Sequence, residues 1–305
     1  MKLEMVGLTD TGVVRENNED NYGLFHEQNI GLVCDGMGGH NAGAIASQIA
    51  VETIKGIINT KNKEILLQLA PDIDPDFQAL IAPVVLGFRL ANLRIFNMAT
   101  QKSEFRGMGT TVAFLGFQEG QAILAHAGDS RIYRIRDREI VLLTEDHSWL
   151  NELLQDKEID KDEARNFEKK NVITRALGMA PRVKVDLKIE PVEAGDLYIL
   201  CTDGLTNSIN DDLIQAITVN YQDDLKSAAD HLVNMAKQVD GSDNITVALI
   251  KVLEVGIHHN SLKKIEIKIA EEDDRVSALE NKYLRRNDSF IRKMKYHVKS
   301  FFLSE

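Results

Sequence analysis

The sequence contains few cysteines, no long apolar run and no excess of positive charge, and each absence argues against a class of protein. Cys34 and Cys201 are the only two cysteines, and each lies in a short apolar segment, so we interpret both as buried thiols of a protein in a reducing cytoplasm. No run of about 18 apolar residues is present, and the first residues lack the core of a signal peptide, so neither a membrane span nor a secretory leader is predicted. The net charge of −11 argues against a general nucleic-acid binder, which would need a basic surface.

The composition is otherwise that of an ordinary globular chain. Its 305 residues, 44% hydrophobic and 27% charged, suffice for one large domain or two smaller ones. Apolar periodicity gives the order strand, helices, many strands, helices, strand. We expect an α+β fold of two stacked antiparallel sheets with helices outside, and we interpret residues 111–143 as one antiparallel meander. The expected helices cover residues 42–58, 61–70, 76–102, 210–219 and 222–239, with a charged helical excursion over 149–170, and the expected strands cover 3–8, 32–34, 111–118, 121–127, 131–136, 139–143, 184–190, 196–202 and 245–252.

Residues 31–40 combine a short apolar strand with a glycine-rich turn. The apolar run ends at Asp35, and three glycines follow within four residues. Glycine allows a sharp turn and a close approach to a ligand, and a carboxylate held at a sheet edge is a good ligand for a hard cation. A plain Asp-Gly turn is the alternative, because this dipeptide is common in turns.

The same arrangement of an acidic residue beside an apolar strand recurs along the chain. Asp203 ends a strand and precedes a glycine, Asp129 follows a strand, and Asp243 lies just before the last strand. Glu19 and Asp20 precede a further apolar segment. Carboxylates that meet in space repel one another unless a cation neutralises them. Oxygen ligands without a set of cysteines and histidines favour magnesium or manganese over zinc.

Arg15 is a cation in an acidic neighbourhood, and its surroundings admit two interpretations. It could form a salt bridge with Glu16 or Glu19, or its guanidinium could bind a phosphate through two hydrogen bonds. The local sequence favours neither.

Residues 256–305 differ in character from the rest of the chain. Partial alternation of apolar residues over 262–269 predicts a short strand, and from residue 276 onward the apolar residues follow helical spacing. Within residues 281–300, seven cations and one carboxylate give a net charge of +6. The segment is either an appended helix packed on the body or a helix that contacts a partner or an anionic membrane.

Eight short motifs occur in order over about residues 1–253. They are Val14-Arg15 with Asn18-Glu19-Asp20, Cys34-Asp35-Gly36-Met37-Gly38-Gly39, Gly107-Met108-Gly109-Thr110-Thr111, Gly128-Asp129-Ser130-Arg131, Asp146-His147-Ser148, Thr174-Arg175-Ala176-Leu177-Gly178, Thr202-Asp203-Gly204-Leu205 and Asp243-Asn244-Ile245-Thr246. In number, order and spacing they resemble the motifs of bacterial-type metal-dependent serine/threonine protein phosphatases, the type 2C (PPM) family.

The resemblance implies a fold, a metal centre and the residues that build it. The fold would be a sandwich of two antiparallel sheets flanked by helix pairs. Residues 1–255 would form the catalytic domain, and residues 256–305 an extension with a short strand and a basic amphipathic helix. The centre would hold two Mn²⁺ or Mg²⁺ ions in a cleft at one end, with a weaker third site. Asp35 would bridge the two ions, the Gly36 carbonyl would bind one of them, and Asp203 and Asp243 would hold the other. Asp20 and Glu19 would bind directly or through water, and Asp129 with Asp203 would form the third site. Arg15 would bind the substrate phosphate.

The implied reaction is hydrolysis of phosphoserine and phosphothreonine in proteins. A water shared by two cations loses its proton readily and can attack phosphorus in line, while the cations offset the charge on the transferring group. Some family members carry a histidine directly after the Asp-Gly pair as a proposed general acid, but this chain has Met37 there, so the proton donor stays open. We interpret His40 as a surface residue at a helix start, His126 as a core residue and His147 as a residue that fixes a loop.

Three functions are compatible with these motifs. The leading hypothesis is a cytoplasmic phosphatase of phosphorylated proteins that opposes a cognate serine/threonine kinase. The second is a regulatory phosphatase for one small partner, and the third is an inactive module that binds phosphoproteins. The presence of Asp35, Asp203 and Asp243 argues against the third. Residues 148–173 match the family's variable flap beside the cleft, and residues 281–303 could contact a partner or the periphery of a membrane.

Overall fold

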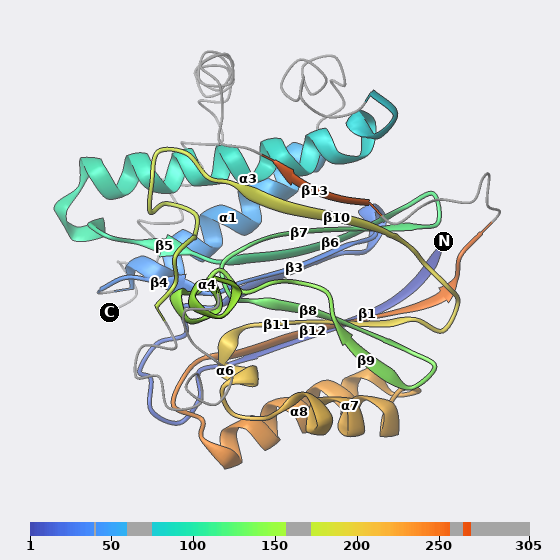
Figure 1. The fold of residues 1–305 in the computed structure, drawn as a ribbon. Helices are drawn as coiled ribbons and strands as arrows, with labels where there is room; N and C mark the ends of the chain where they lie inside the picture. The colour runs from blue at the N-terminus through green and yellow to red at the C-terminus, as the bar shows by residue number, and fades with distance from the viewer. Residues whose placement is uncertain (40, 60–74, 157–171, 257–264, 270–305) are drawn as a thin grey trace.

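The computed structural model describes residues 1–39, 41–59, 75–156, 172–256 and 265–269. Two antiparallel sheets lie face to face, and helices cover the outer face of each sheet (Figure 1). The predicted α+β sandwich with helices outside is therefore confirmed. The expected helix over residues 61–70 lies outside the described residues.

The first sheet joins the first strand of the chain to the strand that ends near residue 254. Its order is β1-β12-β11-β8-β9, and every neighbouring pair is antiparallel. The register places the end of β1, the start of β12 and the end of β11 at one edge, because Asp10 lies opposite Ile245 and Cys201 opposite Val247. The strands are β1 (Lys2–Asp10), β8 (Arg131–Arg136), β9 (Glu139–Leu142), β11 (Leu197–Cys201) and β12 (Ile245–Glu254).

The second sheet has the order β13-β10-β7-β6-β3-β2 and is also antiparallel throughout. Two short strands, β4 and β5, pair in a separate ribbon, in which β4 directly follows β3 in the chain and β5 directly precedes β6. The strands are β2 (Asn21–Phe25), β3 (Ile30–Cys34), β4 (Gly36–Met37), β5 (Gly109–Thr110), β6 (Val112–Gln118), β7 (Gln121–Ala127), β10 (Val185–Pro191) and β13 (Ile265–Ile269).

Helices form the two outer layers of the sandwich. In Figure 1, α1 and α3 cover the second sheet, and α7 and α8 cover the first. Asn41 precedes α1 as expected, but its backbone is left-handed and its side chain makes no capping hydrogen bond. The described helices are α1 (Ala42–Ile58), α3 (Pro75–Gln101), α4 (Trp149–Gln155), α6 (Asp203–Thr206), α7 (Asp211–Asn220) and α8 (Leu225–Val239), with short 3₁₀ turns at His26–Gln28 and Ser103–Phe105.

Three apolar layers hold the sandwich together. One lies between the sheets, one between the second sheet and the pair α1 and α3, and one between the first sheet and the pair α7 and α8. Strands β3, β7 and β11 are buried at every residue because both faces of each sheet are covered. The sequences of β3 and β11 are therefore continuous apolar runs rather than alternating ones, and β7 departs from this only at Gln121 and His126.

One helical segment has the length and hydropathy of a membrane span. It covers residues 81–101 of α3, and 67% of it is buried inside the fold. The helix packs along α1 and over the second sheet. Its apolar character is accounted for by this position in the core.

The predicted single meander over residues 111–143 is wrong, because the chain changes sheet between β7 and β8. The β6–β7 hairpin belongs to the second sheet and the β8–β9 hairpin to the first. Residues 128–130 make the crossing, and Gly128 has a φ of 115°, which favours glycine. The hairpin turns were visible in the sequence, but alternation does not reveal which sheet a hairpin joins.

The two ends of the segment that follows β9 meet at one short β-bridge. Ser148 and Ile173 form an isolated antiparallel bridge, and the Trp149 N–H donates to the Val172 carbonyl at 2.9 Å. The helix α4 begins at this bridge, with the Ser148 side chain accepting a hydrogen bond from the Asn151 N–H. Residues 157–171 of the expected helical excursion lie outside the described residues.

Strand β13 lies in the stretch where partial alternation predicts a short strand. It pairs antiparallel with β10 and is the outermost strand of the second sheet. It therefore covers backbone N–H and C=O groups of β10 that would otherwise form an open edge. The basic helix expected from residue 276 onward lies outside the described residues.

A chain that ends at Val255 is expected to self-associate more strongly than a chain that ends at Ala270, because only the shorter chain exposes the edge of β10. Analytical ultracentrifugation of both chains over a range of concentrations measures the difference. Circular dichroism serves as the control that both chains fold. Equal masses at every concentration would contradict the protective role of β13.

Candidate metal centre

The structure brings all eight predicted site residues to one end of the sandwich. The strand registers produce this gathering, because Cys34 lies opposite Asn21, and Cys201 lies opposite both Val247 and Arg131. Arg15 follows β1, Glu19 and Asp20 precede β2, Asp35 follows β3, Gly36 begins β4, Asp129 follows β7, Asp203 begins α6 after β11, and Asp243 precedes β12.

Asp20 links the two sheets at this end. It precedes β2 of the second sheet, and its Oδ2 accepts hydrogen bonds from Thr202 at 2.8 Å and from Thr246 at 2.7 Å. Both threonines belong to the edge of the first sheet. The carboxylate is buried, and its Oδ1 has no hydrogen-bond partner among the described residues. One oxygen is thus fixed by the protein and the other is left for a ligand.

The backbone of Asp35 is held by Thr110 of β5 and by Thr111, which links β5 to β6. Its N–H donates to Thr111 Oγ1 at 3.0 Å, and its carbonyl accepts from the Thr111 N–H at 2.9 Å and from Thr110 Oγ1 at 2.8 Å. Thr111 Oγ1 also shares a hydrogen bond of 2.7 Å with Ser130 Oγ. These contacts fix the position of Asp35 without using its carboxylate.

Gly36 is required by a close contact between the turn after Asp35 and the start of α1. A Cβ on Gly36 would lie 2.1 Å from the Gly43 carbonyl oxygen and 2.5 Å from the Glu19 carbonyl oxygen. Glu19 caps α1 in place of Asn41, because its Oε1 accepts from the Gly43 N–H at 3.1 Å. One oxygen of the Glu19 carboxylate is therefore occupied in capping α1.

Asp203 and Asp243 lie on the side of the first sheet. Asp203 Oδ2 accepts from Asn207 at 3.0 Å, while its Oδ1 has no partner among the described residues. Asp243 Oδ2 accepts from Arg15 Nη2 at 2.9 Å, so the salt bridge of Arg15 is made with Asp243 and not with the expected Glu16 or Glu19.

Asn244 fastens the loop that carries Arg15 to the loop that carries Asp243. Its Nδ2 donates to the Thr11 and Asn17 carbonyls, and its Oδ1 accepts from the Glu19 N–H at 2.8 Å. Asn244 belongs to one of the eight sequence motifs, where no role was predicted for it. Its hydrogen bonds join residues more than 220 positions apart, which no local pattern reveals.

Burial and mutual repulsion raise the pKa values of the aspartates. Burial is the larger cause at Asp20 and Asp129, and together with the neighbouring Asp203 it raises the pKa of each to about 7. Burial, followed by the charges of Asp20 and Asp203, raises the pKa of Asp35 well above its usual value. Burial and Asp243 also raise the pKa of Asp203. The cluster is therefore short of positive charge.

The donor set fits a pair of hard divalent cations. Among the described residues, the Oδ1 atoms of Asp20, Asp129 and Asp203 are buried without a hydrogen-bond partner. Three orphaned carboxylate oxygens from three separate loops are unusual, because buried polar atoms are normally paired. Bound Mn²⁺ or Mg²⁺ would satisfy these oxygens and neutralise the repulsion.

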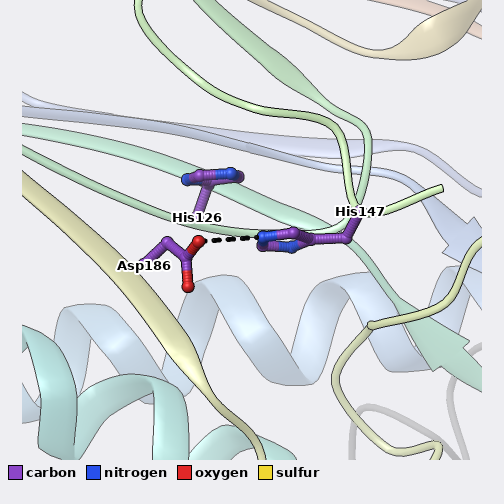
Figure 2. A group of neighbouring side chains, drawn as sticks. All are labelled: His126, His147 and Asp186. Carbon is purple, nitrogen blue, oxygen red and sulfur yellow. Dashed lines mark hydrogen bonds and ion pairs between the residues drawn. The ribbon is translucent and has the colours of Figure 1, made fainter. Parts of the chain in front are cut away.

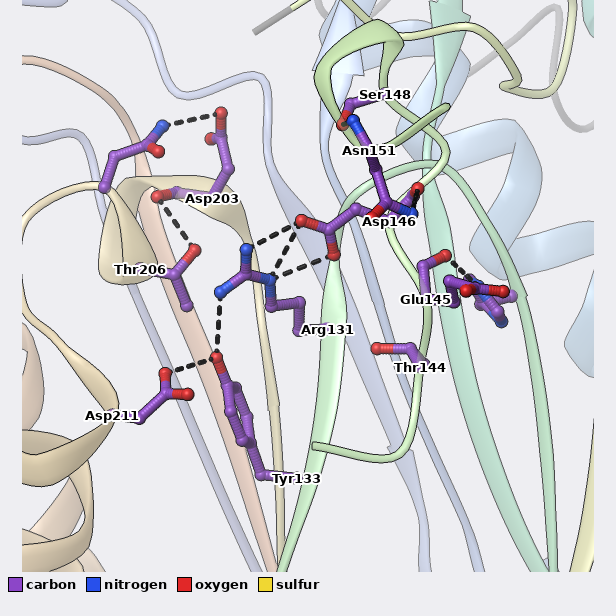
Figure 3. A network of polar contacts seen from close by, with 12 residues as sticks. Arg131, Tyr133, Thr144, Glu145, Asp146, Ser148, Asn151, Asp203, Thr206 and Asp211 are labelled. Carbon is purple, nitrogen blue, oxygen red and sulfur yellow. Dashed lines mark hydrogen bonds and ion pairs between the residues drawn. The ribbon is translucent and has the colours of Figure 1, made fainter. Parts of the chain in front are cut away.

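A polar network supports the turn that carries Asp129 (Figure 3). Arg131 binds the Asp146 carboxylate through Nε at 3.0 Å and Nη2 at 2.7 Å, and its Nη1 donates to the Tyr133 hydroxyl at 3.1 Å. The Tyr133 hydroxyl donates to Asp211 of α7 at 2.9 Å. The start of β8 is thus tied to the base of the flap and to the helical layer.

A second buried cluster lies behind the same turn (Figure 2). Ligand atoms of His126, His147 and Asp186 lie within 4.8 Å of one another, a spacing that could hold a metal ion. However, Arg175 Nη1 lies 2.7 Å from His147 Nε2 and 2.8 Å from Asp186 Oδ1, so a guanidinium already supplies positive charge there. The cluster is therefore better suited to a structural role than to binding a catalytic metal ion.

His147 fixes the turn, as its sequence position suggested. The backbone N–H of His147 donates to the Gly128 carbonyl at 3.1 Å, and the ring Nδ1 of His147 accepts from the Gly128 N–H at 3.0 Å. His126 stacks on it with ring centroids 4.5 Å apart, and burial together with His147 lowers the pKa of His126 to about 4. Sequence reasoning missed the roles of Arg175 and Asp186, which come together only in the folded chain.

Comparisons with known proteins agree with one another. The protein phosphatase 2C family matches residues 13–254. The serine/threonine phosphatase stp of Listeria monocytogenes is 36% identical over 246 residues, which are 80% of this chain and 93% of that protein. The crystal structure of the serine/threonine phosphatase PstP/Ppp of Mycobacterium tuberculosis matches with a TM-score of 0.72 and 29% identity, over 83% of this chain and 99% of that chain. The catalytic domain of the phosphatase PstP in complex with two manganese ions matches with a TM-score of 0.69 and 29% identity, over the same shares of 83% and 99%.

Binding of Mn²⁺ is expected to release protons near neutral pH, because Asp20 and Asp129 are each about half protonated at pH 7 in the metal-free protein. Calorimetric titration with MnCl₂ in buffers of different ionisation enthalpy should give at least one proton released per protein at pH 7, because the pKa values of Asp35 and Asp203 are raised as well, and fewer at about pH 9. The absence of proton release at pH 7 would contradict the raised pKa values.

The same shifts fix the sign of the pH dependence of stability. A carboxyl whose pKa is raised by folding stabilises the fold fully below about pH 4, and this stabilisation is lost as the pH rises through about 7. The Asp20→Asn variant removes one such group, so its metal-free unfolding free energy should fall less steeply over that window.

Proposed function

Because this chain belongs to the protein phosphatase 2C family, we propose that the carboxylate cluster at the end of its sandwich is the catalytic centre. The chain is a protein-serine/threonine phosphatase that depends on Mn²⁺ or Mg²⁺ and acts on phosphorylated proteins. The family, the enzyme class and the metal dependence expected from the motifs are thereby confirmed, and the inactive binding module is set aside. The observation that carries the proposed location is the set of buried, unpartnered carboxylate oxygens.

The proposed ligands follow from which carboxylate oxygens the protein leaves free. The carboxylate of Asp35 and the carbonyl of Gly36 would hold the ions, since the carboxylate of Asp35 is not needed to fix its own backbone. Asp203 would hold the second ion together with Asp243. Asp243 is the exception, because its Oδ1 accepts from the Asn244 N–H at 2.8 Å and its Oδ2 from Arg15 at 2.9 Å. Asp129 with Asp203 forms a weaker third site, and both have a free Oδ1.

Asp20 and Glu19 are proposed to contact the ions directly or through water. Asp20 is held through Oδ2 by two threonine hydroxyls, which leaves Oδ1 facing the cluster. Glu19 is partly engaged at the start of α1. Its role is therefore to close the turn around Gly36 as well as to add negative charge.

Arg15 is proposed to bind the phosphate of the substrate. Its side chain is 52% exposed, and it is tied to the body through one Nη2 bond to Asp243. A guanidinium has five N–H donors, so this bond leaves donors that can point at a phosphate. Arg15 would then orient the phosphoryl group toward the centre while its bond to Asp243 keeps it in place.

When bound, two such cations would lower the pKa of a water molecule that can attack phosphorus and would offset the charge of the phosphoryl group. The residues of the chain position the participants: the threonines fix Asp20 and Asp35, and Arg15 holds the phosphate. Met37 has a thioether and cannot donate a proton to the leaving alkoxide. The proton donor is therefore not the residue directly after Gly36.

Several wider proposals accompany this one. Residues 1–255 form the catalytic domain and residues 256–305 an extension. The enzyme opposes a serine/threonine kinase in the cytoplasm, and the basic segment 281–303 contacts a partner or the periphery of a membrane. The sequence supports the last proposal through the net charge of +6 over residues 281–300.

The Asp203→Asn substitution is expected to lower Mn²⁺-dependent hydrolysis of a phosphothreonine peptide by about 100-fold or more, because charge stabilisation by the ion is worth several kcal/mol. The change is isosteric, so the fold should remain. The measurement compares turnover with Mn²⁺, with Mg²⁺ and with EDTA. The matched control is Asp137→Asn in the exposed β8–β9 turn, and full Mn²⁺-dependent activity of Asp203→Asn would show that the centre lies elsewhere.

The Arg15→Ala substitution is expected to raise KM for the same peptide about tenfold, with a smaller effect on kcat, because a hydrogen bond to a charged group is worth about 1.5–3 kcal/mol. Arg138→Ala, in an exposed turn at the opposite end of β8, is the matched control. An unchanged KM would assign Arg15 to its salt bridge with Asp243 alone.

A further inference from the structure

A pocket of about 680 Å³ opens between the end of α3 and the loop that follows Leu177. Its volume lies within the range of ligand pockets, which is about 300–1,000 Å³. Its apolar lining includes Phe96, Ala99, Met108 and Met179, and its polar lining includes Lys102 and Arg106. The catalytic machinery proposed above uses none of these six residues.

Methionine side chains connect this pocket to the turn after Asp35. In the β4–β5 ribbon, Met37 pairs with Gly109. A Cβ on Gly109 would lie 3.5 Å from Met37 Cγ and 3.7 Å from Met179 Cγ, so both side chains flank this glycine. Methionine is flexible and polarisable, and it recurs on surfaces that accept varied apolar partners.

Met179 is exposed and yet firmly positioned. It is 52% exposed, which is unusual for a large apolar side chain. The buried Asn92 of α3 holds the backbone on both sides of it, accepting from the Gly178 N–H at 2.8 Å and donating to the Ala180 carbonyl at 3.1 Å. The fold thus fixes the backbone that carries Met179 at the pocket, while its flexible side chain can adapt to a ligand.

The rim of the pocket is positive although the chain carries a net charge of −11. Lys102 and Arg106 line the pocket, and no carboxylate of the described residues does. Lys102 lies 3.5 Å from Glu104, whereas Arg106 makes no salt bridge with any carboxylate of the described residues. The charge suits an acidic ligand group, and it repels the chain's own segment 281–300, whose net charge is +6.

The pocket is within reach of a peptide whose phosphoresidue lies at the proposed centre. Met37 is two residues beyond Asp35 and pairs with Gly109, the neighbour of the pocket residue Met108. An extended peptide advances about 3.3 Å per residue. We therefore place the docked residue about three or four positions from the phosphoresidue, which is a span of about 10–13 Å of extended chain.

We propose that this methionine-lined pocket docks the substrate segment beside the phosphoresidue and selects a large apolar residue with an acidic neighbour. The apolar side chain packs on Met179 and Met108, and the acidic one pairs with Arg106. The proposal rests on the proposed position of the metal centre. It assigns substrate selection to residues outside that centre.

The test uses phosphothreonine peptides that differ only at two positions, three and four residues from the phosphothreonine. The pair is Leu-Glu, Leu-Lys or Ala-Ala, placed before the phosphothreonine in one set and after it in another. On one of the two sides, the native enzyme should show kcat/KM about tenfold higher for Leu-Glu than for Ala-Ala. A Met179→Ser variant should lose most of this preference.

Charge reversal separates docking from a loss of folding. Arg106→Glu should invert the preference, so that the Leu-Lys peptide becomes a better substrate than the Leu-Glu peptide. The matched control Arg138→Glu, at the far end of β8, should keep the native order. A gain on one peptide cannot result from misfolding.

Two results would overturn the proposal. One is a native enzyme that hydrolyses all peptides with similar kcat/KM, and the other is an Arg106→Glu variant that keeps the Leu-Glu preference. The position of the centre is tested separately by Asp203→Asn on the Ala-Ala peptide, which does not use the pocket. Full activity of Asp203→Asn would overturn the proposed position of the centre. If Asp203→Asn is inactive while the native enzyme hydrolyses all peptides with similar kcat/KM, only the pocket proposal is overturned.

Discussion

Electrostatic repulsion among the carboxylates at one end of the sandwich is the constraint on which the rest of the structure depends. Asp20, Asp35, Asp129 and Asp203 come from different loops, and each is held at a pKa above its usual value by burial and by its neighbours. No single loop can relieve this repulsion by moving, because every loop is fixed by the register of its strands. Only protons or cations relieve it, and this is why a rigid sheet scaffold suits a centre that must bind metal.

The same end of the molecule also joins its two sheets. The carboxylate of Asp20 belongs to the second sheet and is bound by Thr202 and Thr246 of the first. Asn244 completes this joint, since its Oδ1, just before β12 of the first sheet, accepts a hydrogen bond of 2.8 Å from the Glu19 N–H, just before β2 of the second. Below it, an apolar layer between the sheets continues to the far end. Site geometry and sheet packing are therefore one arrangement, and a change at Asp20 affects both.

The elements and the carboxylates could be predicted because each has a local cause. Strands β3 and β11 are continuous apolar runs since both of their faces are buried, and Asp35 and Asp203 stand out at their ends. Contacts between distant segments had no such signal. The partner of Arg15 proved to be Asp243, which lies 228 residues away. The crossing at Gly128 could not be seen either, because a hairpin has the same pattern in either sheet.

The bridge between Ser148 and Ile173 has an evolutionary consequence. The bridge holds the two ends of the intervening segment together, so the entropy cost of closing this loop is present whatever residues the segment contains. Because the entropy of loop closure rises only slowly with length, segments of different length and sequence can be carried there at little cost in stability. This position is therefore a natural exchange point: recombination between relatives at these two residues would transplant a flap as a cassette, leaving the metal centre and the sandwich untouched.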